Sequence, residues 1–176
     1  MTATISLLDQ SKLTALAERL VDAARRAGAD AADAVAVRSS ALSVEVRDGV
    51  VEETESSESD DLGLRVLVGK RQAVISTNDL SPAAIPALAE RAVAMARVAP
   101  ENEFAGLADA SLLAKQIADL DLLGPDMPSV AHLEARAREA EQAGLAVSGV
   151  SKSGGASAAA GIGGMVLVTS HGFHGA

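Results

Sequence analysis

Two of the three histidines in this chain, His171 and His174, stand three positions apart, and imidazole is a common metal ligand. A pair at that spacing suits a metal ion when both residues lie on one helix. Here glycines surround the pair, the segment is expected to be extended, and no third ligand is evident. His132 stands alone near an expected helix start and is expected to be exposed. The sequence therefore predicts no metal site, and the roles of His171 and His174 stay open.

Carboxylates gather in an acidic run between residues 52 and 61. The run consists of Glu52, Glu53, Glu55, Glu58, Asp60 and Asp61. It lacks the Asp-x-Asp-x-Asp-Gly spacing of a calcium loop. We interpret it as the solvated edge of a β-hairpin, whose charges resist pairing with other chains.

The glycine-rich stretches Gly154–Gly155 and Gly161–Gly164 resemble a phosphate-binding loop in composition only, because no capped helix follows either of them. Both are predicted to be turns. The many Ser and Thr residues offer no basis for selecting a nucleophile, a histidine and an acid as a set. The sequence thus assigns no catalytic, cofactor-binding or metal-binding residue to this chain.

The composition limits the classes of function. The 176 residues carry a formal net charge of −9 and are 48% hydrophobic but only 1% aromatic. An acidic chain is a poor partner for nucleic acid, which is bound through Lys and Arg. The absence of cysteine excludes disulfides and thiolate metal sites and fits a reducing, cytoplasmic location. We expect neither a secretory signal nor a membrane helix, which needs roughly 20 apolar residues.

The elements that must position these residues begin with three amphipathic segments. Helices are predicted over residues 6–27, 82–98 and 129–143. Ser6 and Asp9 are alternative caps for the first helix, which ends at Gly28. Ser81 is expected to cap the second helix and Ser129 the third. The charged residues of the third helix are interpreted as a solvated face: Glu134, Arg136, Arg138, Glu139 and Glu141.

Alternating apolar and polar residues predict β-strands in the first half of the chain. Four strands are expected in an antiparallel meander: Leu42–Arg47, Val50–Glu55, Leu62–Val68 and Gln72–Thr77. Asp48-Gly49 supplies the first turn, because Asp-Gly between two such runs is a strong hairpin signal. Residues 30–38 lead into the sheet, with a bend or bulge at Ser39-Ser40. The predicted fold class is α+β, with a four-stranded meander covered by helices.

The chain is expected to contain two units. Residues 1–105 would form an N-terminal α+β domain, and 106–128 a connecting segment in which 111–118 is a short helix. Residues 129–176 would begin a second, middle domain with a helix and a small-residue β-hairpin. The glycine-rich ending lacks a polar tail, so we expect the second domain to be truncated at Ala176.

Several motifs together resemble the TldD/PmbA family. In the first half they are Val46-Arg-Asp-Gly-Val-Val-Glu, Gly63-Leu-Arg-Val-Leu-Val-Gly-Lys-Arg, Ile75-Ser-Thr-Asn-Asp-Leu-Ser and Ala92-Val-Ala-Met-Ala-Arg. Ser153-Gly-Gly-Ala-Ser and Ser170-His-Gly-Phe-His-Gly follow in the second half. Their order and spacing are closest to the PmbA branch, also called TldE. The chain departs from the family at Lys152, where Asn is usual, and at His174, where Ser is usual.

The resemblance implies a function that composition and periodicity do not show. It implies a non-catalytic subunit of a cytosolic TldD/TldE-type zinc metalloprotease that acts on unfolded peptides, in a family once described as modulators of DNA gyrase. Zinc would belong to the TldD-type partner, and this chain would hold no cofactor. Expected partners are a TldD-type subunit or a second copy, together with unstructured peptides, and neither membrane nor nucleic acid.

Two hypotheses about the function stay open at this point. The alternative to the protease subunit is a stand-alone acidic protein-binding module without a proteolytic role. If peptides are held by strand addition, exposed backbone supplies the contacts. If peptides dock on the strand that contains Val166 and Val168, replacing either residue with proline should impair the processing of peptide substrates.

Overall fold

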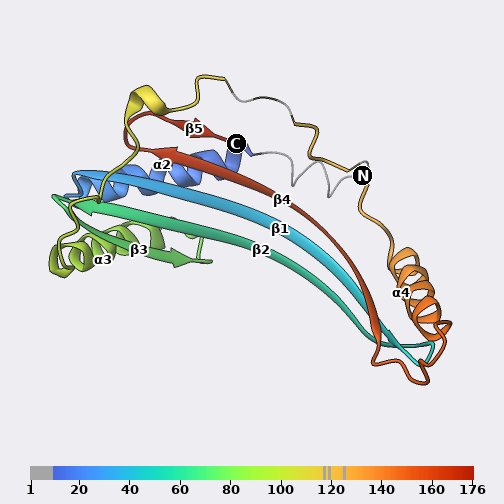
Figure 1. The fold of residues 1–176 in the computed structure, drawn as a ribbon. Coiled ribbons are helices and arrows are strands. Elements are labelled where there is room, and N and C mark those ends of the chain that lie inside the picture. Colours follow the sequence, from blue (N-terminus) through green and yellow to red (C-terminus); the bar gives the residue numbers. More distant parts are fainter. Residues whose placement is uncertain (1–9, 117, 119, 125) are drawn as a thin grey trace.

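The computed structural model describes residues 10–116, 118, 120–124 and 126–176. The elements in chain order are α2 (Ser11–Arg26), β1 (Ala31–Arg47), β2 (Val50–Val68), β3 (Arg71–Thr77), α3 (Ala84–Val98), η1 (Ala110–Leu112), α4 (Val130–Leu145), β4 (Ala156–Thr169) and β5 (His174–Gly175). The strands form one antiparallel sheet in the order β3-β2-β1-β4-β5 (Figure 1). The predicted α+β class and antiparallel sheet are confirmed.

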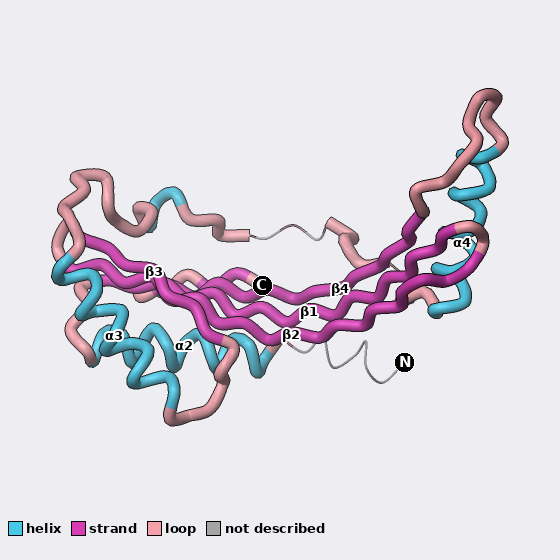
Figure 2. The backbone as a smooth tube through the Cα atoms, turned by 90° about the horizontal axis from the view of Figure 1, so that it is seen from below, coloured by secondary structure: helices cyan, strands magenta, loops and turns pink. Residues whose placement is uncertain are grey.

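The sheet is a long curved ribbon whose two ends are covered by different helices (Figures 1 and 2). α2 and α3 pack at the end that also carries β3 and β5, and α4 packs at the other end. Only β1, β2 and β4 continue to the far end, because β3 pairs with residues 62–68 of β2 and β5 with two residues of β4. We call the three-stranded extension, residues 39–59 and 156–163, the arm.

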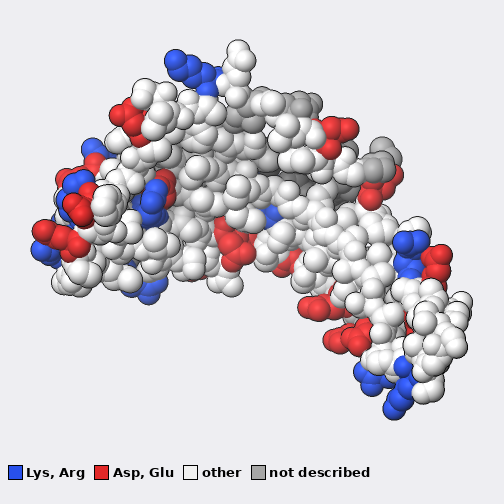
Figure 3. Space-filling model, viewed as in Figure 1, with Lys and Arg blue, Asp and Glu red and all other residues white. Residues whose placement is uncertain are grey.

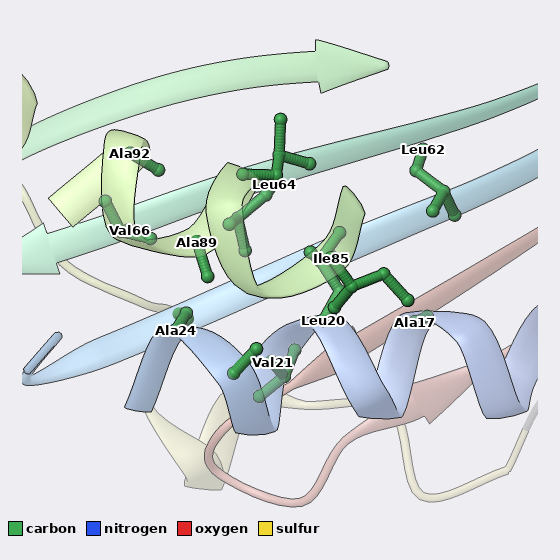
Figure 4. Close-up of a cluster of buried hydrophobic side chains, with 14 of the residues drawn as sticks. Ala17, Leu20, Val21, Ala24, Leu62, Leu64, Val66, Ile85, Ala89 and Ala92 are labelled. Atoms are coloured by element: carbon green, nitrogen blue, oxygen red, sulfur yellow. The ribbon is translucent and has the colours of Figure 1, made fainter. Parts of the chain in front are cut away.

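The main core lies between the sheet and the helices α2 and α3. Small side chains let the helices approach closely: Ala17 and Ala24 of α2 and Ala89 and Ala92 of α3 are fully buried. Larger side chains from β2 fill the space between them, led by Leu64 (Figure 4). Alternation places Ala32, Ala34 and Ala36 of β1 on the same face. This cluster accounts for most of the buried apolar side chains in the described chain.

The four-stranded meander is wrong, because the region holds three strands. β1 runs unbroken through Ser39-Ser40, and β2 runs unbroken through the acidic run. The two pair from Ala31↔Leu67 to Arg47↔Val50, with one register shift between Glu45 and Val46. The pairing of two strands is made of backbone hydrogen bonds. A polar segment with a low strand propensity therefore stays extended when it is paired with a neighbouring strand.

The predicted hairpin at the end of the chain is also wrong, because residues 156–169 form the single strand β4. Gly161–Gly164 is extended instead of turning, and β4 pairs with β1 over fourteen positions, from Asp33↔Thr169 to Val46↔Ala156. A Cβ at Gly163 would lie 3.3 Å from the carbonyl oxygen of Arg38, so the glycine allows close strand approach. Strand β4 thus belongs to the same sheet as β1, while the domain boundaries at 105 and 128 stay a prediction.

Local turn signals were accurate. Asp48 and Gly49 both adopt positive φ, 50° and 71°, as a two-residue hairpin turn of type I′ requires. Gly28 follows α2 with φ 100°, and the hydroxyl of Ser129 accepts the N–H of His132 at the start of α4. The proposed caps Ser6 and Asp9 lie outside the described residues.

Two helix predictions need correction. α3 begins at Ala84 without a side-chain cap, so Ser81 does not play that role through its hydroxyl. Within the described residues, the expected helix over 111–118 is replaced by the short turn η1, which Asp109 caps by accepting the N–H of Ser111. Residue 117 lies outside the described residues. Within the described part of the chain, no helix is both long and apolar enough to span a membrane.

Replacing Leu64 by Ala should cost about 2–5 kcal/mol of unfolding free energy, because its fully buried side chain would leave a cavity. Leu112→Ala is the matched control: the same atoms are removed from a side chain that is 80% exposed, and the cost should stay within about 0.5 kcal/mol. Urea unfolding followed by circular dichroism measures both variants. Equal shifts of the two midpoints would contradict the assigned core.

Candidate functional site

The arm carries its own small hydrophobic core, which makes it a structured part of the molecule. Leu133 and Ala137 of α4 pack on Val44 and Val46 of β1, and all four side chains are buried. This cluster is separate from the main core. Apolar burial is modest here, so the arm needs further contacts to hold its tip against α4.

Glu141 supplies such a contact at the tip of the β1–β2 hairpin. Its side chain is only 4% exposed. One carboxylate oxygen, Oε1, accepts the N–H of Asp48 at 2.9 Å, and the other, Oε2, accepts the N–H of Gly49 at 2.8 Å. The helix thereby satisfies two turn N–H groups that the hairpin leaves unpaired. We call this arrangement the Glu141 latch.

The surroundings of the latch favour the charged carboxylate. The N–H of Gly49 and the hydroxyl of Ser153 donate to it, and with the N–H of Asp48 and the charge of Arg138 they hold the pKa of Glu141 below its ordinary value, although burial opposes this. The prediction that Glu141 lies on a solvated face is wrong. Its spacing from the buried Leu133 and Ala137, at i, i+4 and i+8, places it on the apolar stripe of α4 and was the available signal.

Five of the six residues of the acidic run are exposed on β2, as the interpretation of a solvated edge strand predicts. The sixth residue, Asp60, pairs with the neighbouring strand. Arg38 of β1 donates from Nη2 to Oδ2 of Asp60 at 2.7 Å. The hydrogen bond and charge of Arg38 lower the pKa of Asp60. Acidic side chains line the lower margin of the molecule in Figure 3, where β2 runs.

The histidines do not form a common site. His132 is exposed at the first turn of α4, and His171 is exposed in the turn that follows β4. His174 Nδ1 lies 3.6 Å from Glu18 Oε1 on α2, in an open hollow of about 560 Å³. Among the residues that the structure describes, no group of three or more His, Cys, Asp or Glu side chains is placed to hold a metal ion.

The same hollow contains Ser170, whose hydroxyl has a structural task. Its Oγ accepts the N–H of Ala32 at 3.0 Å, and its own N–H donates to the carbonyl of Ala32 at 2.8 Å. These bonds hold the end of β4 to the start of β1. Both hydrogen bonds of Ser170 therefore fasten the sheet.

The two hydrogen bonds at the end of β4 show which backbone groups face outward. The N–H of Ser170 points to β1, whereas the N–H of Thr169 donates to the carbonyl of Phe173 on the other side, at 3.0 Å. Backbone groups of successive residues point to opposite sides of a strand. Even-numbered residues of β4 therefore bond β1, and odd-numbered residues face the outer edge.

The choice of Val166 and Val168 as probes of a docking edge is therefore wrong. Both are even-numbered, both are buried, and both pair with β1, at Ala36 and Ala34. Proline at either position would remove an internal bond of the sheet. The outward groups that remain are those of residues 157, 159, 161, 163 and 165.

The chain is similar in sequence to known proteins. Residues 32–96 match the family model "PmbA/TldA metallopeptidase domain 1". The chain is 36% identical over 116 residues to Metalloprotease PmbA of Escherichia coli O157:H7, which covers 66% of this chain and 26% of that protein. It is 37% identical over 125 residues to the Metalloprotease PmbA homolog of Haemophilus influenzae, which covers 71% of this chain and 28% of that protein.

Solved structures share the fold. A protein of Bacteroides thetaiotaomicron named as a candidate modulator of DNA gyrase gives a TM-score of 0.78 at 24% identity, covering 95% of this chain and 38% of that one. TldE of Thermococcus kodakarensis gives 0.71 at 15% identity, covering 91% and 36%. Residues 32–96 match the first domain of the PmbA/TldA metallopeptidase family, and the two curated relatives support a chain of the PmbA/TldE type. It spans about a quarter of the length of the curated relatives it matches.

Glu141→Gln should destabilise the arm at neutral pH, because glutamine offers one acceptor oxygen and turns an NH₂ donor toward a turn N–H. Glu139→Gln is the matched control, since the side chain of Glu139 is 70% exposed and forms an ion pair with the exposed Arg136 on the same helix. Urea unfolding of the three proteins between neutral and acidic pH measures the effect.

The pH dependence has a definite sign. Because the folded-state pKa of Glu141 is lowered, its stabilisation is present above the unfolded-state pKa and is lost as the pH falls through the folded-state value. The gap between the parent protein and Glu141→Gln should therefore close on acidification. A gap that is constant with pH, or equal for Glu139→Gln, would contradict the latch.

Proposed function

We propose that this chain supplies a non-catalytic part of a TldD/TldE-type zinc metalloprotease that acts on unfolded peptides in the cytoplasm. The observation that carries the proposal is the match of residues 32–96 to the first domain of the family. The two curated relatives, both named as metalloproteases of the PmbA type, support it. A TldD-type subunit would supply the catalytic zinc.

The tasks of the polar side chains support a scaffolding role. Glu141 holds a turn, Asp60 holds Arg38 across two strands, and Ser170 fastens β4 to β1. Each of these groups is occupied by a contact that shapes the sheet. The non-catalytic assignment is part of the proposal, and the experiment below tests it directly.

The test compares the purified protein alone, a TldD-type partner alone, and the two together, using a fluorescent unstructured peptide with and without a zinc chelator. We expect cleavage to require the partner, to increase when this protein is added, and to stop with the chelator. Glu141→Gln should weaken the increase, whereas Glu139→Gln should leave it unchanged.

Two outcomes would contradict the proposal. Chelator-sensitive cleavage by this protein alone would remove the non-catalytic assignment. Cleavage by the partner that this protein neither increases nor requires would remove the subunit assignment and favour the alternative, a stand-alone acidic binding module.

A further inference from the structure

The bond between Asp48 and Gly49 combines the two residue types that favour the spontaneous isomerisation of aspartate. Asp48 is the only aspartate in the sequence that is followed by glycine, and no asparagine is followed by glycine. The backbone nitrogen that follows an aspartate can attack the side-chain carboxyl of that aspartate. A glycine at this position has no Cβ to hinder the attack. Asp48 is therefore the aspartate of this chain that is chemically most prone to the reaction.

The reaction needs only water. The amide nitrogen of Gly49 forms a bond to Cγ of the protonated Asp48 carboxyl. The hydroxyl of that carboxyl leaves as water together with the amide proton, and a succinimide ring results. Water then opens the ring: breaking the bond from nitrogen to Cγ restores aspartate, whereas breaking the bond from nitrogen to the main-chain carbonyl carbon leaves isoaspartate. Neither step oxidises or reduces any atom.

The fold places this bond in an exposed turn and yet occupies its reacting nitrogen. Asp48 and Gly49 connect β1 to β2 at the end of the ribbon beside α4 (Figure 1), and both residues are exposed. The N–H of Gly49 nevertheless donates to Oε2 of the buried Glu141 at 2.8 Å, and the N–H of Asp48 donates to Oε1 at 2.9 Å. The nitrogen that would attack Cγ is thus held by the Glu141 latch.

We propose that Asp48–Gly49 is a site of spontaneous aspartate isomerisation and that the Glu141 latch suppresses the reaction in the folded chain. Ring closure removes the amide proton of Gly49, so the hydrogen bond to Glu141 has to be given up before the ring can form. The positive φ of Asp48 and of Gly49 and the pairing of Arg47 with Val50 fix the backbone of the turn. The reaction therefore requires a local opening of the tip of the arm.

The charge of Glu141 opposes the reaction as well. A carboxylate beside the turn repels the negative charge that develops on the Gly49 nitrogen when its proton leaves, and it repels the ionised side chain of Asp48. The hydrogen bonds that Glu141 accepts lower its pKa, so its carboxylate is too weak a base to remove an amide proton. The buried acceptor protects the N–H group and does not activate it.

Isomerisation would destroy the contact that prevents it. Isoaspartate adds a methylene group to the main chain, so the turn would no longer fit the pairing of Arg47 with Val50. Its N–H groups would no longer both point at Glu141, and the hairpin would lose its hydrogen bonds to α4. The Glu141 latch thus preserves the covalent main chain at the tip of the arm in addition to holding the arm in place.

Prolonged incubation of the purified chain at neutral pH, followed by electron-transfer mass spectrometry, tests the proposal because this method distinguishes isoaspartate from aspartate. Glu141→Gln should form isoaspartate at position 48 about tenfold faster than the parent, which corresponds to the loss of one hydrogen bond to a charged acceptor. Glu139→Gln is the matched control on the exposed side of the same helix and should react at the parent rate. Circular dichroism confirms that each variant is folded.

A second comparison keeps the proposal testable if Glu141→Gln fails to fold. Asp48→Asn preserves the turn, because asparagine tolerates positive φ, and it converts the reaction into a deamidation that is detected as a gain in mass. The parent and Asp48→Asn should both react at least about tenfold more slowly in buffer than in urea. Equal rates in buffer and urea, or equal rates for folded Glu141→Gln and Glu139→Gln, would overturn the proposal.

Discussion

Every other part of the fold depends on the backbone hydrogen bonds that β1 makes along both of its sides. β2 pairs with it over its full length on one side, and β4 pairs with it over fourteen positions on the other. Regions of these strands that are rich in serine, glycine or glutamate could not fold by side-chain burial alone. They are extended because each has a neighbour whose N–H and C=O groups match its own.

The helices stabilise this ribbon unequally. α2 and α3 bury a large cluster of Ala, Leu and Val side chains at one end, so that end is held by the hydrophobic effect. At the other end α4 offers only Leu133 and Ala137 to the strands. A buried carboxylate on the same stripe, Glu141, fixes the hairpin tip by hydrogen bonds instead. Glu141, Asp60 and Ser170 all hold parts of the sheet together, which fits the scaffolding part proposed for this chain.

Local signals in the sequence allowed part of this fold to be predicted. Asp48-Gly49 indicated a tight hairpin because few residues other than glycine, asparagine and aspartate tolerate positive φ. The fold class followed from alternation in 42–47 and 62–68. The unbroken course of β2 through 52–61 could not be predicted, because it depends on a partner strand and not on local propensity. The position of β4 depended on contacts between residues more than a hundred positions apart.

The same limit applies to the candidate site. The sequence indicated an acidic, solvated edge, and in the structure most residues of that run are exposed on β2. The latch was missed because charged residues on a helix usually face solvent, and Glu141 was not distinguished from its neighbours by type. The sequence did not reveal the continuous strand β4, because its glycines favoured the prediction of a turn.

Amide hydrogen exchange along β1 tests most directly whether the ribbon is one continuous structure fixed at both ends. The account predicts that Val44 and Val46, at the far end under α4, exchange slowly, within about tenfold of Ala34 and Ala36 in the main core. Rapid exchange of Val44 and Val46 alongside slow exchange of Ala34 and Ala36 would show that the far end is not held, and would contradict it.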